Sequence, residues 1–153
     1  MNESLKVTGW YEFLIKDIKG NIKDSWKVDN SVVSAGKAQL ALLAGDASAT
    51  PFTYLAVGTS STAVSAGQTA LVGEITDSGL ARAAATVSRT TTSVTNDTLT
   101  LTYTWTASGT KAVEEIGVFN ASSSGTMLSR ALTTTKSLVS GEQLVATYNL
   151  QFS

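Results

Sequence analysis

The sequence predicts an all-β protein: a β-sandwich or jelly roll of about eight antiparallel strands, with one short helix and an N-terminal β-hairpin. Three observations predict this fold. The chain has 23 threonines and 19 serines among its 153 residues, and threonine favours the pleated, half-exposed surface of a sheet. Only 15% of the residues are charged, against roughly 25% in an average globular domain. Apolar and polar residues also alternate along several segments bounded by Gly, Ser and Asn turns.

The N-terminal segment differs in composition from the rest of the chain. The first 30 residues hold 10 of the 23 charged residues and two of the three tryptophans. Apolar residues alternate with polar ones on both sides of a turn at Gly20, which is typical of a hairpin. We therefore predict a β-hairpin from Lys6 to Asp29, and two parts: a hairpin or arm, residues 1–29, and a β-sandwich domain, residues 30–153. The alternative is that the hairpin supplies the first two strands of the sandwich.

One helix is predicted, from Ser34 to Ala44. Ser34 can cap its N-terminus, the following residues are mostly Ala and Leu, and Gly45 provides a stop. After Pro51, the only proline, the chain continues as short apolar or alternating segments joined by polar turns. The predicted strands are Phe52–Val57, Leu80–Arg89, Val94–Trp105, Val113–Phe119, Thr126–Leu132 and Leu144–Phe152. Strands in this number and at this spacing are typical of a two-sheet sandwich.

The chain lacks the residue types on which most enzyme sites depend. His and Cys are absent, so it cannot form a Ser-His-Asp triad, a Cys-His dyad or an ordinary zinc site. Glu114 and Glu115 are neighbours in a predicted strand, and therefore point to opposite faces rather than acting as a pair. We expect no enzymatic activity, no catalytic residue, no cofactor and no metal.

Charge and hydropathy also limit the partners. The net charge is −1 and basic residues do not cluster after residue 37, whereas phosphate binding needs concentrated Lys and Arg. No apolar stretch approaches the ~20 residues of a membrane-spanning helix. We therefore expect neither nucleic acid nor a membrane as a partner.

Short motifs follow one another in a fixed order from residue 30 to the C-terminal end of the sequence. They are Asn30 with Val32-Val33 and Ser34-Ala35-Gly36; Tyr54, Ala56, Gly58 and Thr59; Thr69-Ala70-Leu71 with Glu74 and Arg82; Glu115, Gly117, Phe119 and Asn120; and Gly125 to Leu128 with Arg130. In this order the motifs resemble a family of small tailed-phage structural proteins, often labelled tail fibre or head decoration proteins. The resemblance implies a β-sandwich that assembles around a symmetry axis in the virion and has no enzymatic activity.

Within that family, we predict a capsid decoration protein that binds the outer surface of the head as a homotrimer and stabilises it. The chain lacks the coiled-coil or repeat shaft that a fibre needs. Its partners would be itself and the major capsid protein or other virion proteins, and its location the virion, after synthesis in the host bacterial cytoplasm. The alternative is a tail-fibre, tail-tip or baseplate adhesin that binds host-surface carbohydrate.

Two sets of residues are candidates for specific roles. Trp10, Tyr11 and Trp26 are predicted interface residues, because buried aromatic side chains dominate the energetics of interfaces. Glu74, Arg82, Glu114, Glu115 and Arg130 are predicted to form a structural charge network. These charges lie inside or next to the phage-like motifs, in a region of the chain where charges are scarce, and we expect an Arg–Glu pair among them that is partly buried.

Overall fold

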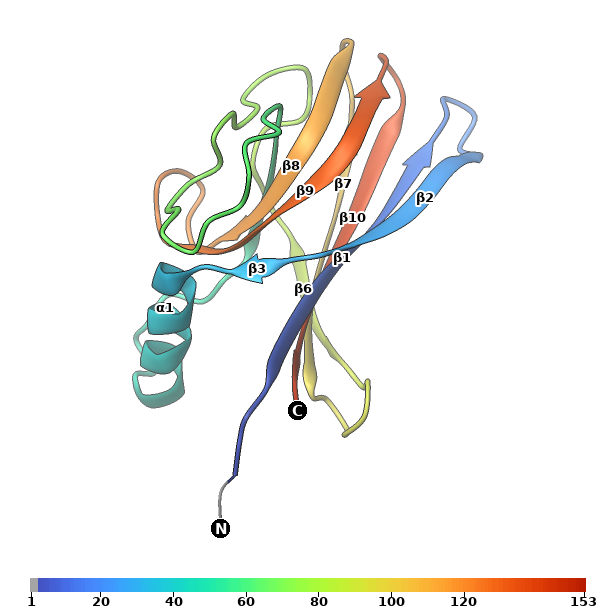
Figure 1. Cartoon of the computed structure of the whole chain (residues 1–153). Coiled ribbons are helices and arrows are strands. Elements are labelled where there is room, and N and C mark those ends of the chain that lie inside the picture. The colour runs from blue at the N-terminus through green and yellow to red at the C-terminus, as the bar shows by residue number, and fades with distance from the viewer. Residues whose placement is uncertain (1–2) are drawn as a thin grey trace.

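Two five-stranded antiparallel sheets pack face to face in the computed structural model, which describes residues 3–153 (Figure 1). Sheet A has the order β2-β1-β10-β7-β6 and sheet B the order β3-β9-β8-β4-β5. In sheet A the strands are β2 (Ile22–Asp29), β1 (Val7–Lys16), β10 (Gln143–Phe152), β7 (Thr98–Thr106) and β6 (Thr86–Thr90). In sheet B they are β3 (Ser31–Val32), β9 (Met127–Leu138), β8 (Lys111–Phe119), β4 (Tyr54–Gly58) and β5 (Ala83–Ala84). The predicted all-β sandwich is confirmed.

The ten strands exceed the predicted eight because β3 and β5 are only two residues long. Strands of that length carry no periodic pattern that a sequence could reveal. The segment predicted as one strand, Leu80–Arg89, is divided between the sheets: β5 pairs with β4 in sheet B, whereas β6 pairs with β7 in sheet A. This segment is therefore one of the places where the chain passes from one sheet to the other.

The predicted N-terminal hairpin forms, and its strands β1 and β2 belong to sheet A. β1 pairs with β2 on one side and with β10 along its whole length on the other, from Val7 opposite Phe152 to Lys16 opposite Gln143. Every second residue from Tyr11 to Ile15 is buried in the main core. β1 is an inner strand of sheet A, and the hairpin supplies strands of the sandwich, as the alternative left open by the sequence expected. The division into residues 1–29 and 30–153 remains a prediction.

The chain passes from sheet A to sheet B through a single residue, Asn30, between β2 and β3 (Figure 1). Asn30 donates a hydrogen bond from Nδ2 to the Tyr148 hydroxyl at 3.3 Å. The ring of Tyr148 packs against that of Tyr11 at a tilt of 43°, with ring centroids 4.8 Å apart. This crossover therefore fixes the two sheets relative to each other at one end of the core.

Apolar side chains from both sheets fill the space between them. Sheet A contributes the larger rings and sheet B mostly aliphatic residues, as expected where alternate residues of each strand point inward. The fully or almost fully buried members are Tyr11, Phe13, Leu101, Trp105, Leu144, Tyr148 and Leu150 from sheet A, and Leu55, Val57, Ile116, Val118 and Leu128 from sheet B. We call this set the inter-sheet core.

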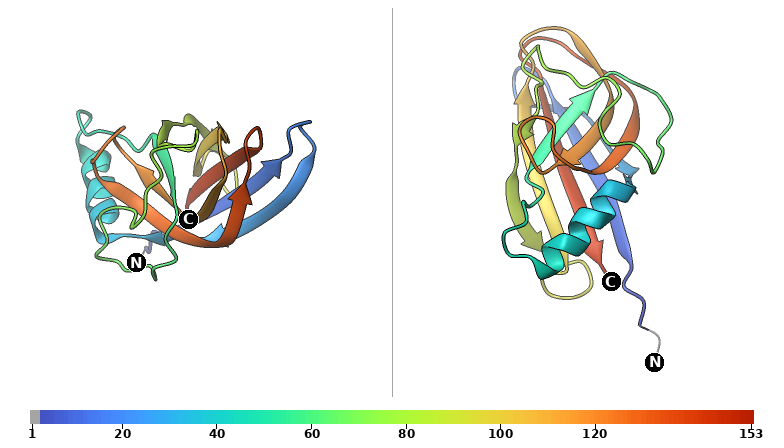
Figure 2. Two further views of the ribbon diagram at one scale, coloured as in Figure 1. Left: turned by 90° about the horizontal axis from the view of Figure 1, so that it is seen from above. Right: turned by 90° about the vertical axis from the view of Figure 1, so that its left-hand side faces the viewer.

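One helix, α1 (Ser34–Gly45), lies outside both sheets (Figures 1 and 2). It ends at Gly45, one residue beyond the predicted Ala44, and Ser34 does not cap it. Val33 is the N-cap residue and makes no side-chain capping hydrogen bond. Of the helical residues only Gly36 is buried, so α1 is held against the sandwich mainly at its first turn. No helix within residues 3–153 is both long and apolar enough to cross a membrane.

Candidate functional site

A long loop, residues 59–82, covers the outer face of sheet B. Between β4 and β5 the chain forms no strand longer than the isolated bridge between Gly58 and Glu74. The loop, green in Figure 1, lies alongside β8 and β9. Under it is a second set of buried apolar residues, separate from the inter-sheet core: Val33, Ala56, Leu71, Phe119 and Met127. We call this set the outer core. Sheet B is therefore buried on both faces.

Two glycines allow the loop to lie so close to the sheet. A Cβ on Gly117 would lie 2.9 Å from Leu71 Cδ2, and a Cβ on Gly58 would overlap the carboxylate of Glu115 and lie 2.7 Å from the Gly73 carbonyl oxygen. Contacts below 3.0 Å do not occur at real Cβ atoms. A side chain at Gly58 would therefore push the main chain of the loop away from β4, and one at Gly117 would force the Leu71 side chain to move.

Glu115 on β8 and Arg130 on β9 form an ion pair beneath this loop. Arg130 Nε donates to Glu115 Oε2 at 2.6 Å, and both side chains have no exposed surface. Glu115 also accepts hydrogen bonds from two loop amides, Gly73 at 2.6 Å and Val72 at 3.2 Å. The carboxylate thus holds residues 72 and 73 against the sheet.

The guanidinium of Arg130 holds the preceding part of the loop. Its Nη1 donates to the Thr62 carbonyl at 2.8 Å and to Gln68 Oε1 at 3.2 Å. Gln68 in turn accepts a hydrogen bond from the Ser65 amide at 3.0 Å. The other terminal nitrogen, Nη2, is buried and has no partner within residues 3–153.

A second pair, Arg82 with Glu74, fixes the end of the loop. Nε and Nη2 of Arg82 donate to the two carboxylate oxygens of Glu74 at 2.8 and 2.7 Å, the bidentate geometry in which an Arg–carboxylate pair is strongest. Nη1 donates to the carbonyls of Ala121 and Ser124 in the β8–β9 turn. The guanidinium also lies 3.6 Å from the centre of the Phe119 ring.

The structure thus brings four of the five residues of the predicted charge network into two pairs and leaves the fifth, Glu114, elsewhere. Glu114 lies on β8 at an irregularity in the pairing with β9, and it accepts a hydrogen bond from the Thr135 hydroxyl at 2.7 Å. In both pairs the charged groups are occupied by each other and by main-chain groups. The arrangement fixes a loop and offers no free acid or base to a substrate.

The three predicted interface aromatics occupy different environments. Tyr11 is completely buried and its hydroxyl is 2.8 Å from Ser129 Oγ, so it has no surface to present to a partner; burial raises the pKa of this phenol well above its usual value. Trp26 is partly buried and stacks on Phe13, with centroids 4.8 Å apart and 10° between planes. Only Trp10 lies on the outer face of sheet A, where its Nε1 donates to Glu12 and Lys27 lies 4.7 Å from its ring. Of the three, Tyr11 therefore faces the core, and the interface role of these residues remains a prediction.

The outer face of sheet A is rich in hydroxyl groups and only partly exposed: Thr104 is exposed, whereas Thr98, Thr100 and Asn149 are buried. Neighbouring strands place Thr102 opposite both Thr147 and Thr86, and Thr100 opposite both Asn149 and Ser88. Hydrogen bonds between the side chains join some of these residues, for example Thr102 with Thr147 at 3.3 Å. Charged groups on this face are confined to β1 and the edge strands. We call it the threonine face.

One ion pair that joins the two sheets could not be found from the sequence. Lys136 on β9 donates to Asp24 on β2 at 2.6 Å, and its ammonium group lies 4.4 Å from the centre of the Trp26 ring. The two residues are 112 positions apart in the chain, and neither lies in a motif. Among the described residues, no three His, Cys, Asp or Glu side chains come together as a metal site would require.

Comparison with known families identifies the chain. Residues 32–152 match the family described as podophage GP4 fiber I protein gp80. The chain belongs to this family. The matched region contains α1, loop 59–82 and all four residues of the two Arg–Glu pairs, so the fiber I family region includes the whole of the site described above. No curated protein and no solved structure matches the chain.

Membership of the fiber I family gives the function at a coarse level. The protein is a structural component of a bacteriophage virion, of a fibre protein family. The resemblance expected from the order of the motifs, to small structural proteins of tailed phages, is confirmed by this match.

Proposed function

We propose that the protein is a component of the fibres of a tailed phage, where it serves as a rigid module that assembles with itself and with neighbouring virion proteins. The observation that carries the proposal is the match of residues 32–152 to a fibre protein family. The prediction from the sequence placed capsid decoration first and a tail-fibre role second. The family is described as a fibre protein family, which favours the tail-fibre role.

The geometry supports a module whose shape is fixed. The long loop of the sandwich is tied to sheet B by two Arg–Glu pairs and by main-chain hydrogen bonds to Glu115. Removing one partner of a buried ion pair destabilises a fold by about 3–5 kcal/mol. Opening of the loop, which would separate these partners, is therefore costly. A fibre transmits contacts between a particle and its target, and a loop held in this way keeps one conformation while it does so.

Self-association is part of the proposal. Both sheets end in edge strands, and a sheet edge presents unpaired main-chain groups that natural proteins cover or block. The threonine face has little charge and therefore little desolvation cost on contact with another protein. We propose a homotrimer, because closed rotational symmetry gives each copy the same contacts.

Capsid decoration remains a second candidate because of one observation. The described chain is a single sandwich without a heptad or repeated shaft, and such a module also suits the surface of a head. Carbohydrate binding belongs to the adhesin form of the fibre role. There Trp10 is the aromatic residue on an open face, beside Glu12 and Lys27, that could stack on a sugar ring.

The location of the protein in the virion tests the proposal. Antibodies against the purified chain, bound to intact virions and viewed by electron microscopy, should label the tail region. In parallel, the labelled chain should bind purified tails and should not bind empty, expanded heads. Labelling of the head surface together with saturable binding to empty heads would contradict the fibre role and establish decoration.

A further inference from the structure

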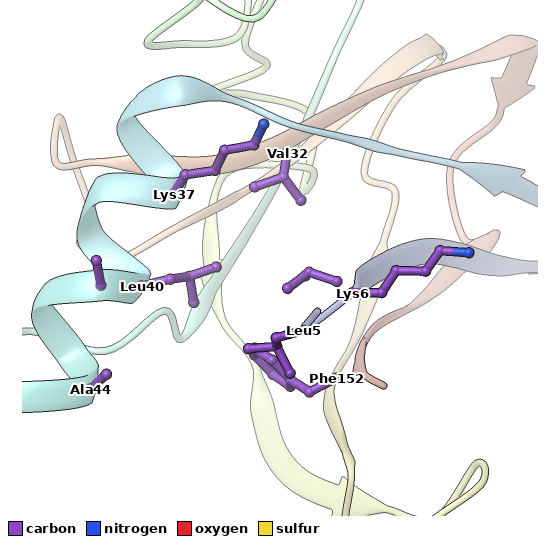
Figure 3. A pocket seen from close by; sticks show the side chains of 9 residues that line it. Leu5, Lys6, Val32, Lys37, Leu40, Ala44 and Phe152 are labelled. Carbon is purple, nitrogen blue, oxygen red and sulfur yellow. The ribbon is translucent and has the colours of Figure 1, made fainter. Parts of the chain in front are cut away.

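An apolar groove lies between α1 and the first strand of sheet A. It has a volume of about 600 Å³. Its walls come from both ends of the chain and from the helix: Leu5, Lys6, Val7, Val32, Lys37, Leu40, Ala41, Ala44 and Phe152. Figure 3 shows Leu40 pointing from the helix into the groove, with Leu5 and Phe152 on the opposite wall. No acidic residue lines it.

The groove lies beside small, exposed side chains on the later turns of the helix, where Leu40 and Leu43 are only partly buried against the core. Gly36 packs against the main chain of Leu128 at the first turn, whereas Ala41 and Ala44 on later turns are exposed. Small side chains on this side of α1 leave a gap between the helix and Phe152. The hydrophobic walls of the gap would gain free energy on contact with an apolar group, by roughly 25 cal/mol per Å² buried.

The groove also carries positive charge without a counter-charge. Neither Lys6 nor Lys37 is among the ion pairs formed within residues 3–153. Lys37 lies along the rim above Val32, and Lys6 points away from the helix (Figure 3). The group that fits the groove is therefore an apolar side chain accompanied by a carboxylate near Lys37.

The chain itself has a segment of this chemistry. Within residues 3–153, Lys6 is the first residue whose main chain pairs with the opposite strand, through two hydrogen bonds with Ser153 of 2.6 and 2.9 Å. Before it, Glu3, Ser4 and Leu5 are exposed and extend beyond the sheet (Figure 1). Leu5 is 73% exposed, so although it stands at the edge of its own groove it does not fill it.

We propose that the groove binds residues 3–5 of a second copy of this chain, with Leu5 of one copy inserted between Leu40 and Phe152 of the next and Glu3 next to Lys37. Such a contact joins different surfaces of the two copies, and repeated by rotation it closes into a ring. A ring of three, the state proposed above, fills every groove once. The proposal rests on the self-association in the proposed function, but not on whether the protein is located in the tail or on the head.

Charge reversal gives the most direct test. Sedimentation velocity on the purified chain should give a mass near three times 15.9 kDa at tens of micromolar. Glu3→Lys and Lys37→Glu should each weaken self-association by about tenfold or more, because each places like charges together. The double variant Glu3→Lys/Lys37→Glu should regain most of the lost association, because the pair is restored with its signs exchanged.

Apolar variants complete the test. Leu5→Ser and Leu40→Glu should each shift the protein toward monomer. Ile18→Ser is the matched control for Leu5→Ser, since Ile18 is 77% exposed in the turn at the other end of sheet A, and it should leave association unchanged. Circular dichroism and thermal unfolding establish that each variant is folded, and a variant that is not folded is replaced by Ala44→Glu, an exposed position on the same wall.

Two results would overturn the proposal. A wild-type chain that is monomeric at these concentrations would show that the groove does not bind a second copy. The occupant of the groove would then have to be a segment of another protein. A trimer that persists in Leu5→Ser and in both charge variants would show that the copies associate through a different surface. Neither result would alter the location of the protein in the virion, which the labelling experiment measures independently.

Discussion

Sheet A and sheet B have the same number of strands but differ in what covers their outer faces. On sheet A the threonine face is partly open: Thr102 and Thr104 are partly or fully exposed, whereas Thr98 and Thr100 on the same strand are buried. On sheet B loop 59–82 covers the corresponding face, so that every residue from Glu115 to Phe119 on β8 is buried. The difference shows that a segment without strands or helices can be as much a part of the core as a strand, provided that its polar groups have partners.

The largest effect is expected on the covered side, at the buried ion pair. Glu115→Gln leaves Arg130 without its counter-charge in a site with no exposure, and should lower the free energy of unfolding by about 3–5 kcal/mol. Urea denaturation followed by circular dichroism measures this loss. Lys111→Met is the control, because the partner of Lys111, Asp77, has 64% of its side chain exposed; its cost should be below about 1 kcal/mol. Equal effects would show that loop 59–82 does not exclude water from Glu115.

The outer core should contribute nearly as much as a position in the inter-sheet core. Leu71→Ala removes the loop's main apolar contact with Gly117 on β8 and should cost about 2–5 kcal/mol. It should also make residues 59–70 sensitive to limited proteolysis. Leu101→Ala, in the inter-sheet core, should cost a similar amount without selective cleavage in the loop. Cleavage at the same rate in both variants would mean that the loop is not held by its own apolar contacts.

A smaller effect is expected at the β6–β7 turn of sheet A, and it should depend on pH. The amides of Val94, Thr92 and Ser93 donate to Asp97 at 2.8–2.9 Å. These hydrogen bonds, of which the one from the Val94 amide has the largest effect, hold the pKa of Asp97 far below its ordinary value. A lowered pKa in the folded state means that this carboxylate stabilises the fold at neutral pH and that the stabilisation is lost as pH falls below about 4.

Replacing this carboxylate isolates its contribution. Asp97→Asn should lower stability at neutral pH and make the thermal midpoint less dependent on pH between about 4 and 2. Thermal unfolding of both proteins at a series of pH values measures the difference. Parallel curves for the variant and the wild type would show that other carboxylates account for the acid sensitivity.

The smallest effect is expected on the partly open threonine face. Thr104→Lys introduces a charge at an exposed position in the middle of this face and should change the free energy of unfolding by less than about 0.5 kcal/mol. The same urea denaturation measures it. A loss of several times this size in a chain shown to be monomeric would indicate that the face is covered by part of the chain itself.

The contrast between the sheets also explains what the sequence could predict. Residues 98–106 on β7 alternate between threonines and apolar residues because only one face of sheet A is buried, so the strand and its orientation were predictable. On β8 the run from Glu115 to Phe119 is buried on both faces and lacks this alternation. The strand was predicted from its apolar content, but nothing in it indicated that a loop covers it.

The charge network could be predicted from the sequence for a different reason. Charges are scarce in this chain, so the few Arg and Glu residues within or beside apolar motifs had reason to be paired. Which Glu belongs to which Arg could not be predicted, since Glu114 and Glu115 are adjacent and only the strand orientation decides between them. The buried position of Tyr11 could not be decided from the sequence, because the hairpin could be an arm or the first two strands of the sandwich, and its partner β10 lies at the other end of the sequence.

The order of strands in sheet A has a consequence for how the protein folds. β10 lies between β1 and β7, so residues 7–16 acquire one of their two neighbours only when residues 143–152 are available. A ribosome that is still producing these residues therefore holds a chain whose first hairpin has one unpaired side, while the β8–β9 hairpin can already form. Contacts of such long sequence separation place folding in the slow range, on the order of milliseconds to seconds. The aggregation-prone edge of the nascent chain is thus the one that β10 covers last.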